Sequence, residues 1–201
     1  MAKLFRFAIA LLLVSGAEGL LASGKPPLPA DTTATVIALR TEYAENPVGI
    51  DVREPRLSWQ IRAGGRGVTQ SAYQIQVARG DRALRSAKGL TWDSGAVKTG
   101  ESVNQAYAGP PLQSGQRYYW QVRIWDGSGK ASGWSEPAFW EMGLLQPSDW
   151  NATWIEPDLP EDVSKSGPSP MLRREFALKG VIERARAYVT SHGLYEMAVN
   201  G

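Results

Sequence analysis

Apolar and polar side chains alternate most regularly in residues 118–125, which read YYWQVRIW. Successive side chains of a strand point to opposite faces, so every second residue from position 118 belongs to one face. That face consists of Tyr118, Trp120, Val122 and Ile124. Residues 126–129 (DGSG) favour a turn, and residues 134–140 (WSEPAFW) are predicted to return as an antiparallel strand. The hairpin has one heavily aromatic face, which a second sheet must cover.

Shorter alternating runs recur upstream about every ten residues, with turn-forming residues between them. We predict strands at 36–43, 57–61, 73–77, 92–95 and 102–107, and either one helical turn or a polar loop at 82–88. Short strands at this spacing predict an all-β fold, a fibronectin type III/immunoglobulin-like β-sandwich over residues 36–143. Its predicted core consists of Trp59, Tyr73, Ile75, Val77, Trp120, Val122 and Ile124.

The strand that begins at position 118 is preceded by a local pattern found in such sandwiches. Leu112, Gly115 and Tyr118 are spaced three residues apart, which resembles the tyrosine corner of fibronectin type III domains. In that corner the ring is buried and its hydroxyl group bonds to the backbone upstream. We therefore expect both features at Tyr118.

The composition changes after residue 143. Residues 144–170 are rich in proline and acidic residues and are predicted to form a linker. Strand patterns then resume at 172–178, 185–190 and 194–199, so residues 171–201 are predicted to be the first strands of a second, incomplete β-domain.

The last two residues, Asn200 and Gly201, form the strongest two-residue hairpin signal, because both turn positions need a positive φ. No strand follows them. We therefore expect the chain to be a fragment of a longer polypeptide, the alternative being an ordinary exposed C-terminus.

Residues 1–24 have the pattern of a signal peptide. Lys3 and Arg6 precede an apolar run at 7–14 (FAIALLLV), which is too short to span a bilayer. Small residues follow, so cleavage is expected after Ala17 or Gly24, and residues 25–35 are predicted to be an extended N-terminal segment. The alternative is a buried N-terminal helix. Export would place the protein in a bacterial periplasm or outside the cell, with no membrane anchor after signal removal.

Charge and cysteine content narrow the classes of function. The net charge is +2, and no Lys/Arg cluster forms a stripe, so nucleic acid is not an expected partner. The sequence has no cysteine and one histidine, which excludes disulfides and thiolate catalysis and leaves little material for a metal site. We expect no cofactor and no metal.

Several groups of residues are candidates for chemistry. Four carboxylates at 156–162 could suggest acid/base catalysis or calcium binding, but a proline-rich linker cannot hold two carboxyl groups across a cleft. His192 is predicted to be an exposed turn residue, and the adhesion-type tripeptide at 79–81 (RGD) to be a chance occurrence. Tyr119 and Trp125 are predicted to lie on the face of the strand opposite the core. Aromatic side chains on that face could stack on sugar rings, but we expect them to be buried against a neighbouring domain.

Taken in order, several segments resemble the N-terminal part of bacterial α-L-rhamnosidases, a glycoside hydrolase family. The segments are 46–51 (NPVGID), 55–59 (PRLSW), 92–95 (WDSG), 117–126 (RYYWQVRIWD), 134–135 (WS), 140–145 (WEMGLL), 152–155 (ATWI), 172–176 (LRREF) and 185–201 (ARAYVTSHGLYEMAVNG). Each is weak alone, but their joint order and spacing are specific, because a generic fibronectin-like domain does not continue into the later segments.

The resemblance implies a fibronectin-like sandwich, then a jelly-roll-like β-domain, and later a catalytic barrel of helical hairpins. It implies inverting hydrolysis of terminal α-L-rhamnose by two carboxyl groups of that barrel. No residue of this sequence matches them, so we assign no catalytic, cofactor-binding or metal-binding residue here. The implied partners are a rhamnose-containing glycoside or polysaccharide, bound by the missing catalytic domain, and the downstream domains, against which this region would pack.

Two functions from different classes follow. In the first, the chain is a non-catalytic N-terminal fragment of a secreted α-L-rhamnosidase-like enzyme and is inactive alone. In the second, it is a free-standing extracellular β-sandwich that binds carbohydrate or protein.

Overall fold

A computed structural model describes residues 34–158, 160, 162, 164–165, 167, 169–182 and 184–200. The predicted signal peptide and nearly all of the predicted extended segment at 25–35 lie outside these residues. The chain divides into two units at the bond between Asn151 and Ala152, and each is described separately.

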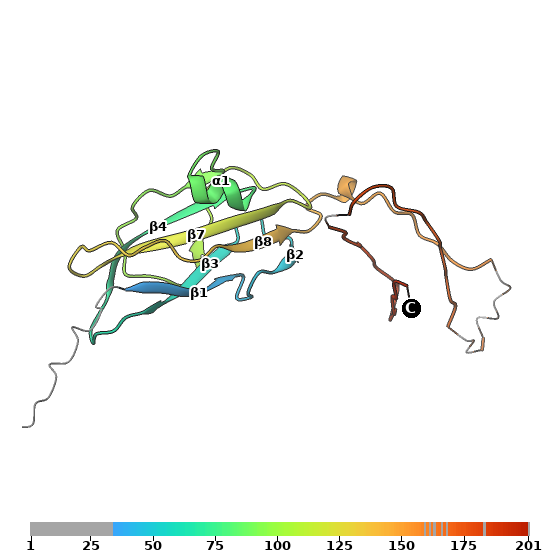
Figure 1. Cartoon of the computed structure of the whole chain (residues 1–201). Helices are drawn as coiled ribbons and strands as arrows, with labels where there is room; N and C mark the ends of the chain where they lie inside the picture. The colour runs from blue at the N-terminus through green and yellow to red at the C-terminus, as the bar shows by residue number, and fades with distance from the viewer. Residues whose placement is uncertain are drawn as a thin grey trace, which may run out of the picture. The chain divides into compact units, whose positions relative to one another are not determined.

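The first unit is a sandwich of two β-sheets (Figure 1). The smaller sheet has the order β1 (Thr35–Thr41), β3 (Arg56–Arg62), β6 (Gln105–Ala106). The larger sheet has the order β2 (Val48–Ile50), β8 (Ala138–Met142), β7 (Arg117–Asp126), β4 (Gln70–Ala78), β5 (Trp92–Asp93). Its neighbours are antiparallel except β2 and β8, which are parallel.

The edges of both sheets are short or irregular. β2, β5 and β6 have two or three residues each, and the register of β1 shifts between Ile37 and Arg40. Short and bulged edges offer few unpaired backbone groups to another strand.

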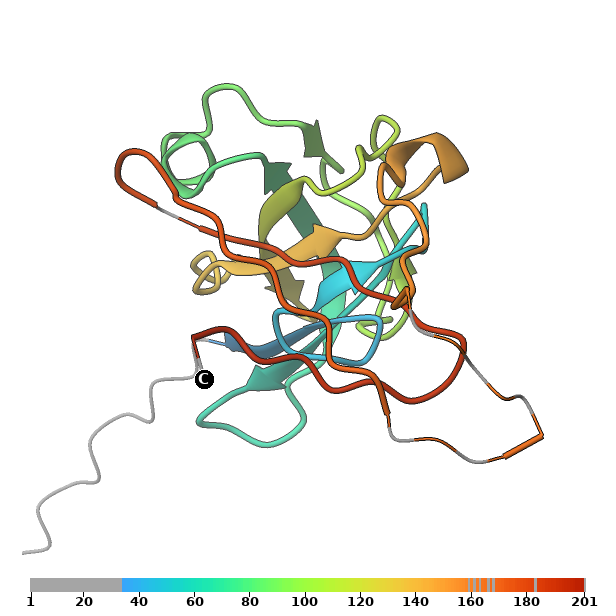
Figure 2. The ribbon, with the colours of Figure 1, turned by 90° about the vertical axis from the view of Figure 1, so that its right-hand side faces the viewer.

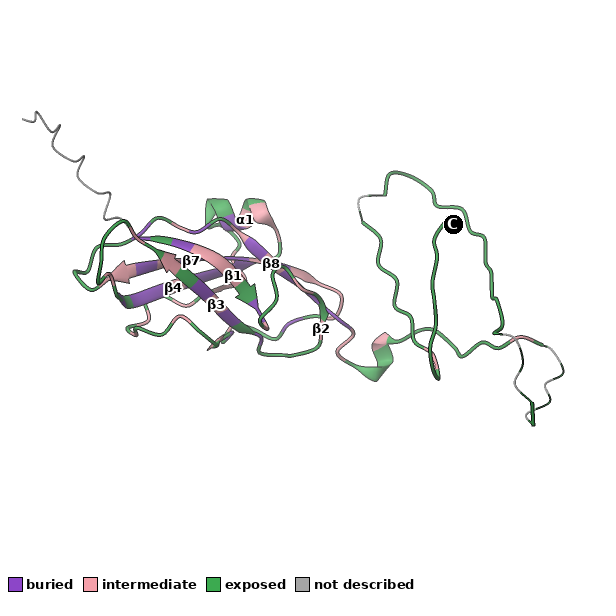
Figure 3. Ribbon diagram, turned by 90° about the horizontal axis from the view of Figure 1, so that it is seen from below, coloured by how far each residue is buried: buried purple, intermediate pink, exposed green. Residues whose placement is uncertain are grey.

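The predicted core is confirmed. The seven residues expected there are all buried, and Ile75, Val77, Trp120, Val122 and Ile124 are fully buried. Figure 3 shows this burial along the strands of the sandwich. Trp59 of the smaller sheet packs edge-on against Tyr73 of the larger sheet, with 5.0 Å between ring centroids. Alternation of apolar residues on both sheets therefore produces a single core between them, and the all-β sandwich predicted from sequence is what the chain forms.

The tyrosine corner is also confirmed. Tyr118 is fully buried, and its hydroxyl group accepts a hydrogen bond of 3.0 Å from the backbone N–H of Gln113. Gly115 has a φ of +66°, the left-handed conformation that glycine adopts most easily. The Tyr118 ring stacks on Trp140 at 5.6 Å, so the corner fixes the start of β7 against β8.

The predicted hairpin is formed, with β8 antiparallel to β7, but its return strand was predicted to start too early. β8 begins only at Ala138, because residues 131–137 are irregular. Ser132 and Ser135 donate their backbone N–H groups to the carbonyls of Ile124 and Val122. Their hydroxyl groups, instead of backbone carbonyls, accept the N–H groups of the same two residues. The serine hydroxyl groups thus accept the hydrogen bonds of two backbone N–H groups of β7 that a regular strand would accept with its carbonyls. Residues 132–137 can therefore follow an irregular path beside β7.

Two other elements were incompletely predicted. The 82–88 region forms a short helix, α1 (Asp81–Ser86), whose Leu84 is fully buried. β2 was not predicted, because the turn signal at Asn46 and Pro47 precedes a strand of only three residues.

The described residues of the second unit contain neither helix nor strand. The strands predicted at 172–178, 185–190 and 194–199 are therefore not formed in this structure. A strand needs a hydrogen-bonded neighbour, and apolar side chains here remain exposed, among them Phe176 (72%) and Val199 (71%). A second β-domain beginning at 171 stays a prediction.

Candidate functional site

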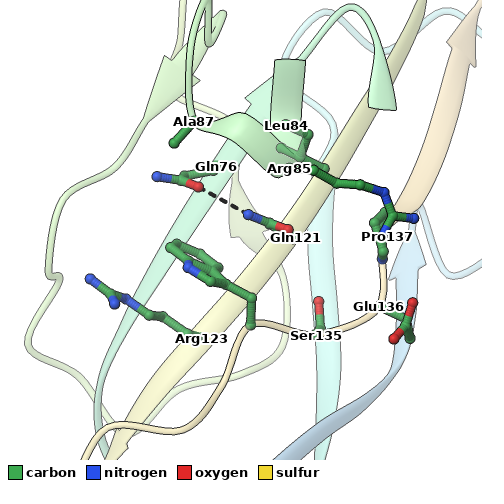
Figure 4. Close-up of a pocket in the computed structure, with 10 residues that line it drawn as sticks. Gln76, Leu84, Arg85, Ala87, Gln121, Arg123, Ser135, Glu136 and Pro137 are labelled. Atoms are coloured by element: carbon green, nitrogen blue, oxygen red, sulfur yellow. Dashed lines mark hydrogen bonds between the residues drawn. The ribbon is translucent and has the colours of Figure 1, made fainter. Parts of the chain in front are cut away.

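The described part of the sandwich carries an open groove of about 540 Å³ on the outer face of the larger sheet. Its floor is formed by Gln76 of β4 and Gln121 of β7 (Figure 4). One wall is α1, which lies on the side of this sheet that faces away from β1 and β3 (Figures 1 and 2). The irregular segment 134–137 forms the other wall. Both walls of the groove, α1 and the segment 134–137, are thus elements whose structure the sequence pattern did not fully predict.

A chain of side-chain amides orders the floor of the groove. Asp93 of β5 accepts hydrogen bonds from the Nε2 atoms of Gln74 (2.6 Å) and Gln76 (2.9 Å). The Oε1 atom of Gln76 in turn accepts a bond of 3.0 Å from Nε2 of Gln121. Because a carboxylate only accepts, it fixes which end of each amide points toward it. The Oε1 atom of Gln121 accepts no hydrogen bond from another described residue and is not one of the fully buried atoms without a partner, so it is open to the groove.

Asp93 is held in its charged form. Burial would raise the pKa of its carboxyl group, but the hydrogen bonds from Gln74, Gln76 and the backbone of Gly95, with the charge of Arg123, lower it below its usual value. The amide network therefore keeps one orientation at neutral pH.

Arg123 and Trp134 close one end of the groove. The Nε and Nη2 atoms of Arg123 donate to Oε1 of Gln74 at 3.0 and 2.7 Å. Its guanidinium lies over the ring of Trp134 at 4.8 Å and over that of Trp125 at 5.0 Å. Trp134 lines the groove and is half-buried. The cation thus holds the indole of Trp134 in place by stacking.

The other end of the groove carries charges of both signs. Arg85 of α1 pairs with Asp81 at 2.9 Å, and Glu136 lines the groove from the facing segment. Hydrogen bonding and the charge of Asp81, with a smaller effect of Glu136, raise the pKa of Arg85. The groove therefore presents a charged pair, two amides and an indole around one hollow.

The candidates identified from sequence lie elsewhere or form no site. Glu156, Asp158 and Asp162 are exposed, Glu161 lies outside the described residues, and no cluster of three metal-ligating side chains occurs in the part that the structure describes. His192 is exposed and stacks on Trp154 at 4.1 Å.

The adhesion-type tripeptide at 79–81 runs into α1. Gly80 is the residue before the helix, and Asp81 is its first residue, bound to Arg85. The tripeptide therefore follows β4, as predicted, and its carboxylate already has a partner.

The two outward aromatic residues meet different neighbours. Tyr119 is half-buried against Phe139 at 6.1 Å, next to a buried ion pair in which Arg117 holds Glu141 at 3.1 Å. Trp125 is half-buried beside Arg123. Both lie on the face of β7 opposite the core, as the alternation predicts.

Sequence reasoning missed the groove residues. The signal was present as outward polar positions on two strands, Gln74 and Gln76 on one and Gln121 and Arg123 on the other. Their register, which pairs Gln76 with Gln121 and Gln74 with Arg123, comes only from the sheet. Among the ten residues that line the groove, Glu136 is the one with a carboxyl group, so the arrangement suits binding rather than acid/base chemistry.

None of the helices among the described residues is long and apolar enough to cross a bilayer.

The family model described as "Rha78A-like, N-terminal immunoglobulin domain" matches residues 36–146. An alpha-L-rhamnosidase of Streptomyces avermitilis is 47% identical over 123 residues, which cover 59% of this chain and 11% of that protein. An alpha-L-rhamnosidase of Formosa agariphila is 38% identical over 167 residues, which cover 80% of this chain and 18% of that protein.

A solved structure gives the same result. The crystal structure of the S. avermitilis alpha-L-rhamnosidase complexed with L-rhamnose matches with a TM-score of 0.59 and 45% identity, over 61% of this chain and 12% of that one. The matched regions are therefore only 11–18% of the length of these relatives.

Proposed function

Since the chain belongs to the family of Rha78A-like N-terminal immunoglobulin domains, we propose that it is a non-catalytic N-terminal region of an exported α-L-rhamnosidase-like glycoside hydrolase. The parent enzyme would remove terminal α-L-rhamnose with inversion. The sandwich would stabilise that enzyme and pack on its downstream domains.

The observation that carries this proposal is the share of each relative that is matched. Two relatives from different bacterial species are both named alpha-L-rhamnosidase, and each matches over less than a fifth of its length. The family model describes that matched region as N-terminal. A catalytic domain would then lie in the part of the parent that this chain does not match.

The chemistry of the described residues agrees with a non-catalytic role. Inverting hydrolysis needs a carboxylic acid at the leaving oxygen and a carboxylate that activates water, about 6.5–9.5 Å apart across a cleft. The groove offers Glu136 alone. Among the described residues the most buried carboxyl group, that of Glu141, is paired with Arg117 and lies outside the groove.

We expect the purified chain of 201 residues to release no aryl alcohol from an aryl α-L-rhamnoside, because the groove in its described part holds one carboxyl group where the reaction needs two. A longer protein that continues into the catalytic barrel should be active. Its first sugar product, followed by proton NMR, should be the β-anomer of rhamnose if the reaction inverts.

Two results would contradict the proposal. One is turnover by the short chain that disappears when one of its own Asp or Glu residues is changed to the amide. The other concerns deletion of residues 36–142 from the longer protein. We expect that deletion to lower soluble yield and Tm with little change in the kcat of the folded fraction. A large fall in kcat at unchanged Tm would place part of the active site on the sandwich.

Export is tested separately. We propose that residues 1–24 direct export and are removed, on the pattern of Lys3, Arg6 and the apolar run after them. Intact-mass measurement of the protein recovered from the periplasm of a bacterial host should show cleavage after Ala17 or Gly24. A secreted or periplasmic protein that still begins at Met1 would refute this.

A further inference from the structure

We propose that the groove between α1 and residues 134–137 binds one neutral pyranose unit of a glycan. This deepens the proposed function, because the sandwich would then hold a carbohydrate chain as well as stabilise the enzyme. The assignment stands on a preoriented hydrogen-bond acceptor, an aromatic wall and a polar wall, which surround one hollow.

The acceptor is Oε1 of Gln121. Gln121 is 6% exposed, and its Nε2 atom is already committed to Gln76. Gln76 is committed in turn to the charged Asp93, so the amide of Gln121 cannot rotate without breaking a bond. The Oε1 atom is not among the fully buried atoms that lack a partner, so it is open to the groove as an acceptor that a ligand donor can reach. A sugar hydroxyl is a donor of the right size.

Trp134 supplies the aromatic wall. A pyranose ring has an apolar face of C–H groups, which pack on an electron-rich ring by dispersion and weak C–H contacts. The stacked guanidinium of Arg123 fixes the indole, and Arg123 is itself fixed by Gln74. The wall is therefore ordered before any ligand arrives, which reduces the entropy lost on binding.

The polar wall lies at the other end of the groove, where Arg85 extends from α1 toward Pro137 and Glu136 comes from the facing segment (Figure 4). Hydroxyl groups of sugars both donate and accept, so a donor and an acceptor side by side match a pair of neighbouring hydroxyl groups. The charges also decide the class of ligand. Arg85 is offset by Asp81 and Glu136, and Arg123 by Asp93, which leaves no positive excess to attract a uronate or a phosphate.

A protein partner fits the groove less well. Protein interfaces bury large apolar anchors in fully desolvated pockets, whereas the floor here consists of two amides. The volume of about 540 Å³ lies within the range of small-molecule sites.

The test is an NMR titration of the whole ¹⁵N-labelled chain with methyl α-L-rhamnopyranoside, the sugar class of the relatives' printed names. The chain has eight indole N–H signals, and that of Trp134 can be assigned from a Trp134→Phe variant. We expect saturable shifts of the Trp134 indole and of the Gln121 side-chain amide, with a Kd on the order of 1–10 mM, as for a single small ligand. Methyl α-D-galactopyranosiduronate should bind at least several-fold more weakly.

Matched variants separate binding from folding. Trp134→Ala and Gln121→Leu should each weaken binding about tenfold or more, whereas Trp150→Ala, at a tryptophan outside the groove, should not. The buried indole signals of Trp120 and Trp140 report whether the sandwich is still folded in the Trp134→Ala variant.

The proposal is overturned if neither group shifts, if the shifts appear at Trp125 or Trp150 instead, or if binding survives both groove variants with the fold intact. Unchanged NMR signals with the sugar, followed by shifts at Trp134 when the downstream domains are added, would make the groove a domain contact. The titration measures binding by this chain alone. A longer protein without rhamnosidase activity would contradict the proposed function but would not change the result of the titration.

Discussion

Trp120→Ala should lower the free energy of unfolding of the sandwich by about 3–5 kcal/mol, the usual cost of replacing a buried tryptophan by alanine. Trp120 is fully buried at the centre of β7, between β4 and β8. Its indole N–H donates no hydrogen bond to any described residue. The expected loss of stability therefore comes from lost packing alone, because the substitution breaks no hydrogen bond of the indole. Urea unfolding followed by far-UV circular dichroism measures it.

The matched controls use the same residue type. Trp150→Ala should change stability by less than about 1 kcal/mol, because Trp150 is 38% exposed. Trp120→Phe should cost less than Trp120→Ala, since it keeps a ring and removes a buried N–H that has no partner. A loss below about 1 kcal/mol for Trp120→Ala would show that the inward face of β7 is assigned wrongly.

A chain of residues 34–151 should fold cooperatively on its own, whereas residues 152–201 alone should not fold. The first contains both sheets and the single core. The second exposes its apolar side chains, with Leu194 and Val181 almost fully exposed, and has no ladder among its described residues. Thermal unfolding and proton NMR of the two pieces test this.

The cut belongs after residue 151 because the start of the predicted linker is tied to the sandwich. The carboxylate of Asp149 accepts hydrogen bonds from the Ser114 hydroxyl and from the backbone of Gln146, and these bonds lower the pKa of Asp149. Arg53 also donates to the carbonyl of Leu145 at 2.9 Å. Dispersed, sharp amide signals from residues 152–201 alone would refute the prediction.

Alternation was enough to predict the core of this fold, because burial on one face of a strand is a local property of sequence. Every second residue of 118–125 lies in the core. The start of the return strand could not be predicted, because it does not depend on local sequence alone. Whether residues 131–137 pair regularly depends on two serine hydroxyl groups that reach the neighbouring strand, and their aim cannot be read from spacing.

The groove could not be predicted for a related reason. Its residues come from β4, β7, α1 and the irregular segment, and only the sheet register brings Gln76 next to Gln121. Of the carboxylates at 156–162, those of Glu156, Asp158 and Asp162 are described, and they are exposed and belong to no helix or strand. Composition thus indicates where charge is abundant, whereas a site requires side chains that are held in place.

The short edges of both sheets have a consequence for how the polypeptide is made. A ribosome delivers about 5–20 residues per second, N-terminal domains first, so this sandwich would be complete while a following chain is still being synthesised. With β2, β5 and β6 reduced to two or three residues and β1 interrupted, the finished sandwich offers little for a newly emerging strand to pair with. In the longer parent protein proposed above, strands synthesised later would therefore find few unpaired backbone groups on this sandwich.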